Sequence, residues 1–313
     1  MPYDELQERL RSVSFTTATP FDADGNAILR EQIAENAQTL YEAGGRVFIP
    51  CGNTGEYYSL SQAERIEVVT ATVDALPDDA TVVGGVGGST KNALELLEAY
   101  ADAGADAAMI MYPRHTYIHE EGLIEYYRTL AESTDLGIVL YKRGPLLNER
   151  VLEELSTISN VVAVKYAVND VKQFARLTET VTGDVVWLNG VAERYALAYA
   201  LEGADGFTTG IGNFVPQPVL ALDRAIRDGN WDRAREIRNA LRSYEDLREE
   251  AGGGPAFSAA KNVPVVKRGL DLQGMYGGPV REPLIELDDD DRERVATYLE
   301  SLEAENYLTS PSA

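Results

Sequence analysis

The sequence predicts an α/β fold, a (β/α)8 TIM barrel with a C-terminal helical extension. Apolar runs of strand length alternate with amphipathic helical stretches, and glycines stand where a helix ends and the next strand begins. The unit repeats about every 20–30 residues. A doubly wound sheet shows the same alternation, but eight consecutive units without a dinucleotide-binding glycine loop favour a closed barrel.

Each predicted strand is a short apolar run. The strands cover residues 13–21, 46–50, 81–88, 107–113, 137–143, 161–167, 185–190 and 206–213. Helical patterns lie between them, for example at residues 29–44 and 91–104. Glycines at 43–45, 103–105 and 202–204 end a helix directly before the next strand.

The pattern changes after residue 228, where helical segments follow one another without strands. We therefore expect a barrel with an N-terminal helix over residues 1–228 and a helical region over 229–313 that packs on it. The aspartate tract 288–291 predicts a helix N-terminus, because negative charge is favourable at that end of the helix dipole.

The formal net charge of −23 indicates a heavily solvated, acidic surface. The acidic residues are spread over the helical stretches rather than gathered in one tail, and lysines are few relative to arginines. Nucleic acids and anionic membranes both require a basic face, so the charge argues against either as a partner. Salt screens the mutual repulsion of such charges, which suggests a halophilic protein.

The single cysteine, Cys51, excludes an internal disulfide and a thiolate metal cluster, which suits a reducing cytoplasm. The N-terminal residues predict a charged helix rather than a signal peptide. No apolar run approaches the roughly 18 residues that a membrane span needs. We expect a soluble, cytoplasmic protein.

His115 and His119 are the two histidines of the chain. Their His-x-x-x-His spacing would suit a metal ion on a helix, but this segment is predicted to be a loop and no pair of carboxylates completes the site. We therefore expect neither a metal ion nor another cofactor.

Lys165 stands inside the apolar run 161–167 rather than at its edge. A lysine in a buried strand must pair its ammonium or lose its charge. Alternate side chains of a barrel strand face the interior, and chemistry takes place at the C-terminal ends of the strands. Burial lowers the pKa of an amine and exposes the lone pair that imine formation with a ketone or aldehyde requires. The alternative is a structural, ion-paired lysine.

Tyr141 lies near the end of the preceding predicted strand, so its side chain can reach the same barrel mouth as Lys165. A phenol there can shuttle protons to a carbinolamine and to the substrate. The alternative is a tyrosine that only fills the barrel.

The segment CGNTGEYYSLS (51–61) follows the second predicted strand directly. Two glycines beside a hydroxyl residue suit a cradle of backbone N–H groups for an anion such as a substrate carboxylate. Ser61 and Glu64 form a capping-box pattern that predicts the start of the next helix. The alternative is an ordinary glycine-rich turn, and the missing Walker lysine argues against a nucleotide. Glu56 is expected to be a structural hydrogen-bond acceptor.

Taken in order, these segments resemble the dihydrodipicolinate synthase/N-acetylneuraminate lyase superfamily of class I, Schiff-base-forming barrels. The similarity extends from residue 19 to residue 284. It covers the family's G-x-T-G-E loop, the tyrosine of strand five, the imine lysine and the glycine after strand seven. The matching positions here are Gly52, Thr54, Gly55, Glu56, Tyr141, Lys165 and Gly190.

Within the superfamily, the sequence is most similar to the 5-dehydro-4-deoxyglucarate dehydratase pattern. TGEYYSLS (54–61) resembles its T-G-E-F-F-S-L, and YKRGPLL (141–147) resembles its Y-N-R-D-N-x-x-L and keeps Arg143. Residues 189–217 and 277–287 are similar to further segments of the same pattern. The acidic composition resembles that of haloarchaeal members.

Several positions depart from the family. Asn53 stands where synthases and lyases carry threonine or serine, and Lys142 and Gly144 replace family residues beside the tyrosine. Dihydrodipicolinate synthases place an arginine a few residues after the tyrosine to hold a second carboxylate, whereas Pro145 and its direct successors carry none. Those synthases also pass a tyrosine across a dimer interface, whereas the nearest positions here are His115 and Thr116, with Tyr117 close by. The synthase reaction is therefore disfavoured.

The resemblance implies that Lys165 forms the Schiff base and that Tyr141 relays protons. Arg143 is expected to bind a distal carboxylate or hydroxyl, and Asn53 to orient the leaving hydroxyl. The substrate-binding residues expected in all are Asn53, Thr54, Gly55, Arg143, Gly190 and Thr208.

The reaction expected first is dehydration of a 2-keto-3-deoxy sugar acid, with or without decarboxylation. The alternatives are a 2-keto-3-deoxygluconate-type aldolase that releases pyruvate, a dihydrodipicolinate synthase, and a non-catalytic, ligand-binding barrel, since the fold alone does not fix function. The resemblance also implies a homotetramer built from dimers.

Overall fold

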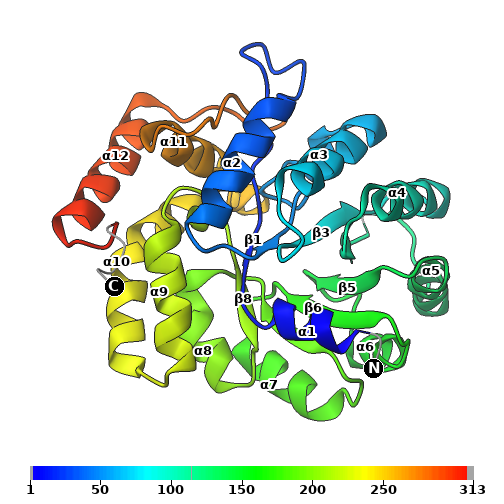
Figure 1. Cartoon of the computed structure of the whole chain (residues 1–313). Helices are drawn as coiled ribbons and strands as arrows, with labels where there is room; N and C mark the ends of the chain where they lie inside the picture. The colour runs from blue at the N-terminus through cyan, green and yellow to red at the C-terminus, as the bar shows by residue number, and fades with distance from the viewer. Residues whose placement is uncertain (1–2, 114, 309–313) are drawn as a thin grey trace.

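The computed structural model describes residues 3–113 and 115–308. Its parallel strands form a barrel (Figure 1). They follow one another around the barrel in the order of the sequence, and β1 closes it by pairing with both β2 and β8. The strands are β1 (Val13–Phe15), β2 (Val47–Phe48), β3 (Thr81–Val86), β4 (Ala107–Ile110), β5 (Gly137–Lys142), β6 (Val161–Tyr166), β7 (Val186–Asn189) and β8 (Gly206–Thr209). The predicted barrel is therefore confirmed.

Helices surround the strands, and further helices follow β8, the last strand of the barrel (Figure 1). The helices from the N-terminus to β8 are α1 (Asp4–Leu10), α2 (Arg30–Glu42), α3 (Gln62–Ala75), α4 (Thr90–Ala103), α5 (Glu120–Glu132), α6 (Glu149–Ser156), α7 (Val171–Thr180) and α8 (Ala196–Leu201). After β8 come α9 (Pro216–Arg227), α10 (Trp231–Glu249), α11 (Asn262–Leu272) and α12 (Asp289–Ala304). The predicted C-terminal helices are thus present.

The observed strands are shorter than the apolar runs that predict them. β1 ends at Phe15 although its run extends to residue 21, and β8 ends at Thr209 although its run extends to residue 213. Pro20 has no N–H to donate to a strand ladder, and Ile211–Asn213 forms a short 3₁₀ helix, η3. The first run therefore ends in a loop and the second in a 3₁₀ turn, both at the C-terminal mouth of the barrel.

Helix α1 covers the opposite, N-terminal end of the barrel. The Gln7 side-chain amide donates to the Asp184 carbonyl at 2.7 Å, and the Tyr3 hydroxyl donates to the Asp135 carbonyl at 2.9 Å. Arg11 forms an ion pair with Asp205. Its three acceptors stand just before β7, β5 and β8, so α1 ties together the beginnings of these strands.

Two predicted helix starts are confirmed. Ser61 accepts a hydrogen bond from the Glu64 N–H while the Glu64 carboxylate accepts one from the Ser61 N–H, the reciprocal capping box that begins α3. The aspartate tract begins α12, where the Asp288 carboxylate accepts from the Asp291 N–H at 2.9 Å. Each cap satisfies N–H groups that a helix start leaves without intrahelical partners.

One continuous cluster of buried apolar side chains joins β1 and β8 to helices on both sides of residue 228. It includes Phe15 and Phe207 of the strands, Leu222 of α9, Leu241 of α10 and Leu299 of α12. The division at residue 228 stays a prediction, because this core crosses it. Among the described residues, no helix is long and apolar enough to cross a membrane.

Candidate active site

Adjacent strands β5 and β6 place Tyr141 and Lys165 side by side. The two residues are register partners, and so are their neighbours Lys142 and Tyr166. The Tyr166 ring packs against Phe174 of α7, so it points outward, toward the helices. Since side chains alternate along a strand, Tyr141 and Lys165 point into the barrel. The Lys165 amine lies 4.8 Å from the centroid of the Tyr141 ring.

Lys165 is 4% exposed. Burial lowers the pKa of its amine to about 7, and the positive charge of Arg143 acts in the same direction. Loss of hydration penalises the ammonium, and a nearby cation penalises it further. At neutral pH a large fraction of this amine is therefore unprotonated and able to attack a carbonyl.

The loop after β2 brings Asn53 to the tyrosine. The Asn53 side-chain amide donates to the Tyr141 hydroxyl oxygen at 2.9 Å. A hydrogen bond from the Glu56 N–H to the Asn53 carbonyl, at 3.1 Å, closes the turn that carries this amide. Glu56 itself has a left-handed backbone, with φ of 55°. An amide N–H only donates, so Asn53 fixes the phenol oxygen but takes no proton from it.

Two glycines let this loop lie close to its neighbours. A Cβ at Gly55 would stand 2.8 Å from the Thr17 carbonyl oxygen, and a Cβ at Gly85 of β3 would stand 2.0 Å from the Cys51 carbonyl oxygen. Either side chain would displace the 51–56 segment, so both glycines are required by close backbone contact.

The Thr54 hydroxyl belongs to a chain of hydroxyls at the end of β1. It lies 3.1 Å from the Thr16 hydroxyl, which in turn lies 2.6 Å from the Thr209 carbonyl oxygen. A carbonyl only accepts, so the single Thr16 hydroxyl hydrogen is donated to the Thr209 carbonyl. The Thr16 oxygen then accepts a hydrogen bond from the Thr54 hydroxyl. The backbone N–H groups of the loop are therefore better candidates than this hydroxyl for holding a carboxylate.

The other predicted residues lie at the same end of the barrel. Gly190 follows β7 and donates its N–H to the Tyr166 carbonyl at 2.7 Å. Thr208 is buried in β8, in register with Ser14 of β1. Arg143 is exposed and follows β5 directly. Within the predicted set, a direct side-chain hydrogen bond joins Asn53 to Tyr141.

Two buried lysines were not among the predicted site residues. Lys142 points outward from β5, where its amine donates to the Gly144 carbonyl at 3.0 Å and lies over the Tyr166 ring. Lys267 of α11 forms an ion pair with Glu56 at 2.6 Å. A lysine is almost never fully buried unless its amine is paired. The sequence alone does not reveal the partners of these two lysines.

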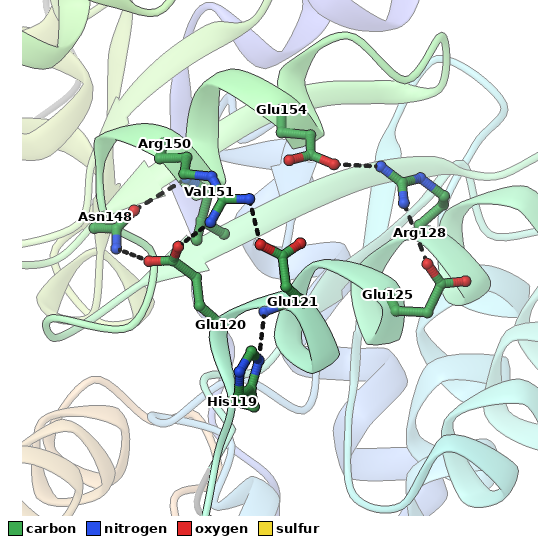
Figure 2. Close-up of polar contacts among 9 residues, drawn as sticks. All are labelled: His119, Glu120, Glu121, Glu125, Arg128, Asn148, Arg150, Val151 and Glu154. Carbon is green, nitrogen blue, oxygen red and sulfur yellow. Dashed lines mark hydrogen bonds and ion pairs between the residues drawn. The ribbon is translucent and has the colours of Figure 1, made fainter.

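The two histidines accept hydrogen bonds from the backbone. His119 Nδ1 accepts from the Glu121 N–H at the start of α5, as Figure 2 shows, and His115 Nδ1 accepts from the Tyr117 N–H. The described residues include no group of three or more histidines, cysteines and acidic residues placed to hold a metal ion.

An ion-pair network links α5 to α6, next to the segment that contains the two histidines (Figure 2). Arg150 pairs with both Glu120 and Glu121, and Arg128 pairs with Glu154 at 2.7 Å. The network fixes the start of α5, and with it the end of the loop that follows β4.

A buried lysine beside a tyrosine inside the mouth of a (β/α)8 barrel is the arrangement that Schiff-base-forming, class I lyases require. The chain belongs to the family described as the dihydrodipicolinate synthetase family, whose model matches residues 9–302. It is an enzyme of this lyase family, whose substrates are small keto acids.

Similar proteins carry two different functional names. The chain is 34% identical over 295 residues to a 4-hydroxy-tetrahydrodipicolinate synthase of Methanothrix thermoacetophila, covering 92% of this chain and 96% of that protein. It is 31% identical over 313 residues to a probable 5-dehydro-4-deoxyglucarate dehydratase of Saccharopolyspora erythraea, covering 97% of each.

The crystal structure of dihydrodipicolinate synthase from Oceanobacillus iheyensis superimposes with a TM-score of 0.91 at 32% identity, covering 96% of this chain and 99% of that one. The synthase name thus accompanies the higher identity. The comparisons therefore favour the synthase reaction, which was named above as an alternative, over the dehydratase reaction expected first.

Proposed function

We propose that the protein forms a Schiff base between Lys165 and a 2-keto acid. The observation that carries the proposal is the buried amine, with a pKa of about 7, beside the Tyr141 ring. The loop at Thr54 and Gly55 holds the substrate carboxylate through backbone N–H groups, which places the neighbouring ketone at the amine.

The amine of Lys165 adds to the ketone carbon, and Tyr141 moves protons as the carbinolamine loses water to give an iminium. The iminium acidifies the adjacent methylene, because the electron pair released there delocalises onto nitrogen. Removal of that proton gives an enamine. Asn53 holds the phenol oxygen in place throughout, since its amide donates to that oxygen.

From the enamine of a 2-keto-3-deoxy sugar acid, the electron pair expels the hydroxyl on the next carbon. The hydroxyl gains a proton and leaves as water, and hydrolysis of the unsaturated iminium frees Lys165. We place this dehydration first because the residues beside the reacting atoms favour it. Asn53 offers an amide to the substrate hydroxyl, and Arg143 offers a charge to the distal end of an aldarate-derived substrate.

The synthase reaction is the second candidate, and the names and identities of the similar proteins favour it. Against it, Pro145 and the residues directly after it supply no arginine for a second carboxylate. Overall identity is spread over the whole chain, whereas this difference lies beside the tyrosine. An aldolase, which cleaves the next C–C bond and releases pyruvate, uses the same iminium and is the third candidate.

Substrate assays separate the three reactions. The enzyme is incubated with 5-dehydro-4-deoxyglucarate, 2-keto-3-deoxygluconate and the pentonate analogues, and separately with pyruvate and an aldehyde. A semialdehyde formed without pyruvate, with loss of carbon dioxide when the substrate is 5-dehydro-4-deoxyglucarate, marks the dehydratase, and pyruvate release marks the aldolase. Consumption of pyruvate together with the aldehyde, without pyruvate release from any of the sugar acids, marks the synthase and would overturn the order proposed here.

Borohydride trapping tests the imine itself. Reduction in the presence of a keto acid should add a stable mass to the peptide that contains Lys165, and a Lys165→Met variant should not be labelled. If no keto acid labels the native protein, the non-catalytic, ligand-binding barrel becomes the better interpretation. We further propose a homotetramer, which light scattering of the purified protein checks.

A further inference from the structure

A buried ion pair joins the candidate active-site loop to the C-terminal helices. Lys267 of α11 lies 2.6 Å from a carboxylate oxygen of Glu56, and their side chains are 2% and 0% exposed. The two residues are far apart in the sequence, so the pair forms only when α11 packs against the barrel mouth.

The surroundings of the pair come from the same two regions. The Lys267 amine also donates to the Pro279 carbonyl, at 2.5 Å, and the second Glu56 oxygen accepts from the Arg281 N–H at 2.9 Å. The Lys267 amine and the Arg281 guanidinium both lie over the Phe21 ring, at 4.2 Å and 4.0 Å from its centroid. The pair is thus enclosed by α11, by the chain after it and by the loop after β1.

A short chain of contacts leads from this pair to the reacting groups. Glu56 donates its N–H to the Asn53 carbonyl at 3.1 Å, and the Asn53 amide donates to the Tyr141 hydroxyl oxygen at 2.9 Å. Tyr141 lies beside Lys165. The backbone of Glu56 is left-handed, a conformation that a non-glycine residue keeps only when its surroundings impose it.

Stability alone is a poor explanation for such a pair. Removing two charges from water costs about as much as their attraction returns, and apolar residues of similar volume often serve as well or better. What two charges add to an apolar contact is direction, because the carboxylate must stay where the ammonium and the Arg281 N–H point.

We propose that Lys267 is a positioning residue for the Schiff-base chemistry. It acts through Glu56, whose fixed carboxylate sets the 53–56 turn and so holds the Asn53 amide against Tyr141. The inference rests on the proposed function, since it concerns the geometry in which Lys165 meets a keto acid. The C-terminal helices thereby contribute to catalysis without touching the substrate.

The test compares the rate of borohydride-trapped imine formation on Lys165, per folded molecule, in four proteins. These are the native protein, Lys267→Met, the double variant Glu56→Gln/Lys267→Met, and Lys261→Met. Pyruvate is the probe, with the best sugar-acid substrate as a second. The double variant removes both charges at nearly constant volume, so it keeps the test decisive if Lys267→Met does not fold.

Lys261→Met is the matched control. Lys261 precedes α11 and pairs with Glu250 and Asp291 at 2.6 Å each. The substitution therefore removes a lysine ion pair from the same region without reaching the 51–56 loop. We expect native trapping rates in this control. In both Lys267 variants the trapping rate should fall by about 10²-fold, a loss that misplacing a reacting group by about 1 Å can cause.

Two results distinguish the possible failures. If the native protein forms no trapped imine, the proposed function is wrong. If the native protein is labelled and the folded double variant is labelled equally fast, the pair is structural only and the inference is overturned.

Discussion

At the scale of single residues, the main feature of the candidate site is the burial of the Lys165 amine, which lowers its pKa. Lys165 occupies a position that an aliphatic side chain would fill at lower cost, because burying an amine opposes its protonation. The proposed role of Lys165 as a nucleophile near neutral pH would explain why the fold keeps an amine here at a cost in stability.

The depressed pKa of Lys165 predicts the pH dependence of imine formation. Below about pH 7 the amine is protonated and cannot attack; above it the amine is neutral. The trapping rate with pyruvate should therefore rise through pH 7 and level off, rather than rise up to the ordinary lysine range near 10.5. Arg143→Met should move the midpoint upward, because the Arg143 charge lowers this pKa. A rate still rising at pH 9 would contradict the assignment.

The Tyr141 hydroxyl should matter for rate more than for stability. Tyr141→Phe keeps the ring and removes the proton relay, so we expect kcat to fall by about 10²–10⁴-fold. Tyr166→Phe is the control, since this buried hydroxyl on the neighbouring strand donates outward to the Asp170 carbonyl at 3.0 Å. It should alter the unfolding midpoint and leave kcat close to native. Equal kcat losses in both variants would argue against the relay.

At the scale of secondary-structure elements, caps decide where helices begin. Asp288→Ala removes the side-chain acceptor from the first turn of α12 and should lower the free energy of unfolding by about 1 kcal/mol. Asp290→Ala removes a carboxylate from the same turn without the capping position, so its effect should be only a few tenths of a kcal/mol. Urea denaturation measures both. A larger loss for Asp290→Ala would contradict the capping role.

Elements were predicted well where period and local chemistry agree. The eight strands, the capping box at Ser61 and the aspartate start of α12 all follow from residues close together in the sequence. Strand ends were predicted less well. An apolar run does not distinguish the last ladder residue from the buried loop beyond it, as at Thr209.

Contacts between distant elements could not be predicted. The sequence marks Lys165 because a lysine interrupts an apolar run, but Lys267 lies in a helical pattern where a lysine is unremarkable by itself. Its partner Glu56 follows the second strand, far away in the sequence. Only folding brings the Lys267 amine to 2.6 Å from the Glu56 carboxylate. Likewise, the Asn53 amide on the Tyr141 oxygen depends on the exact path of one loop.

At the scale of the whole molecule, the net charge of −23 sets the response to salt. Like charges repel in the compact state, and the screening length falls from about 10 Å at 0.1 M salt to about 3 Å at 1 M. The unfolding midpoint should therefore rise over this range of KCl. Sucrose at matched water activity controls for general solvent effects. A midpoint that is unchanged or falls in KCl would mean that the ion pairs outweigh the repulsion.

Helix α1, held by Gln7 and Tyr3, lies at the end of the barrel opposite the mouth that contains Lys165. The interior of such a barrel is filled by side chains, so a molecule that enters at the C-terminal mouth also leaves there. A departing molecule thus blocks the next arrival, and accumulated product should compete with fresh substrate for the vacant enzyme.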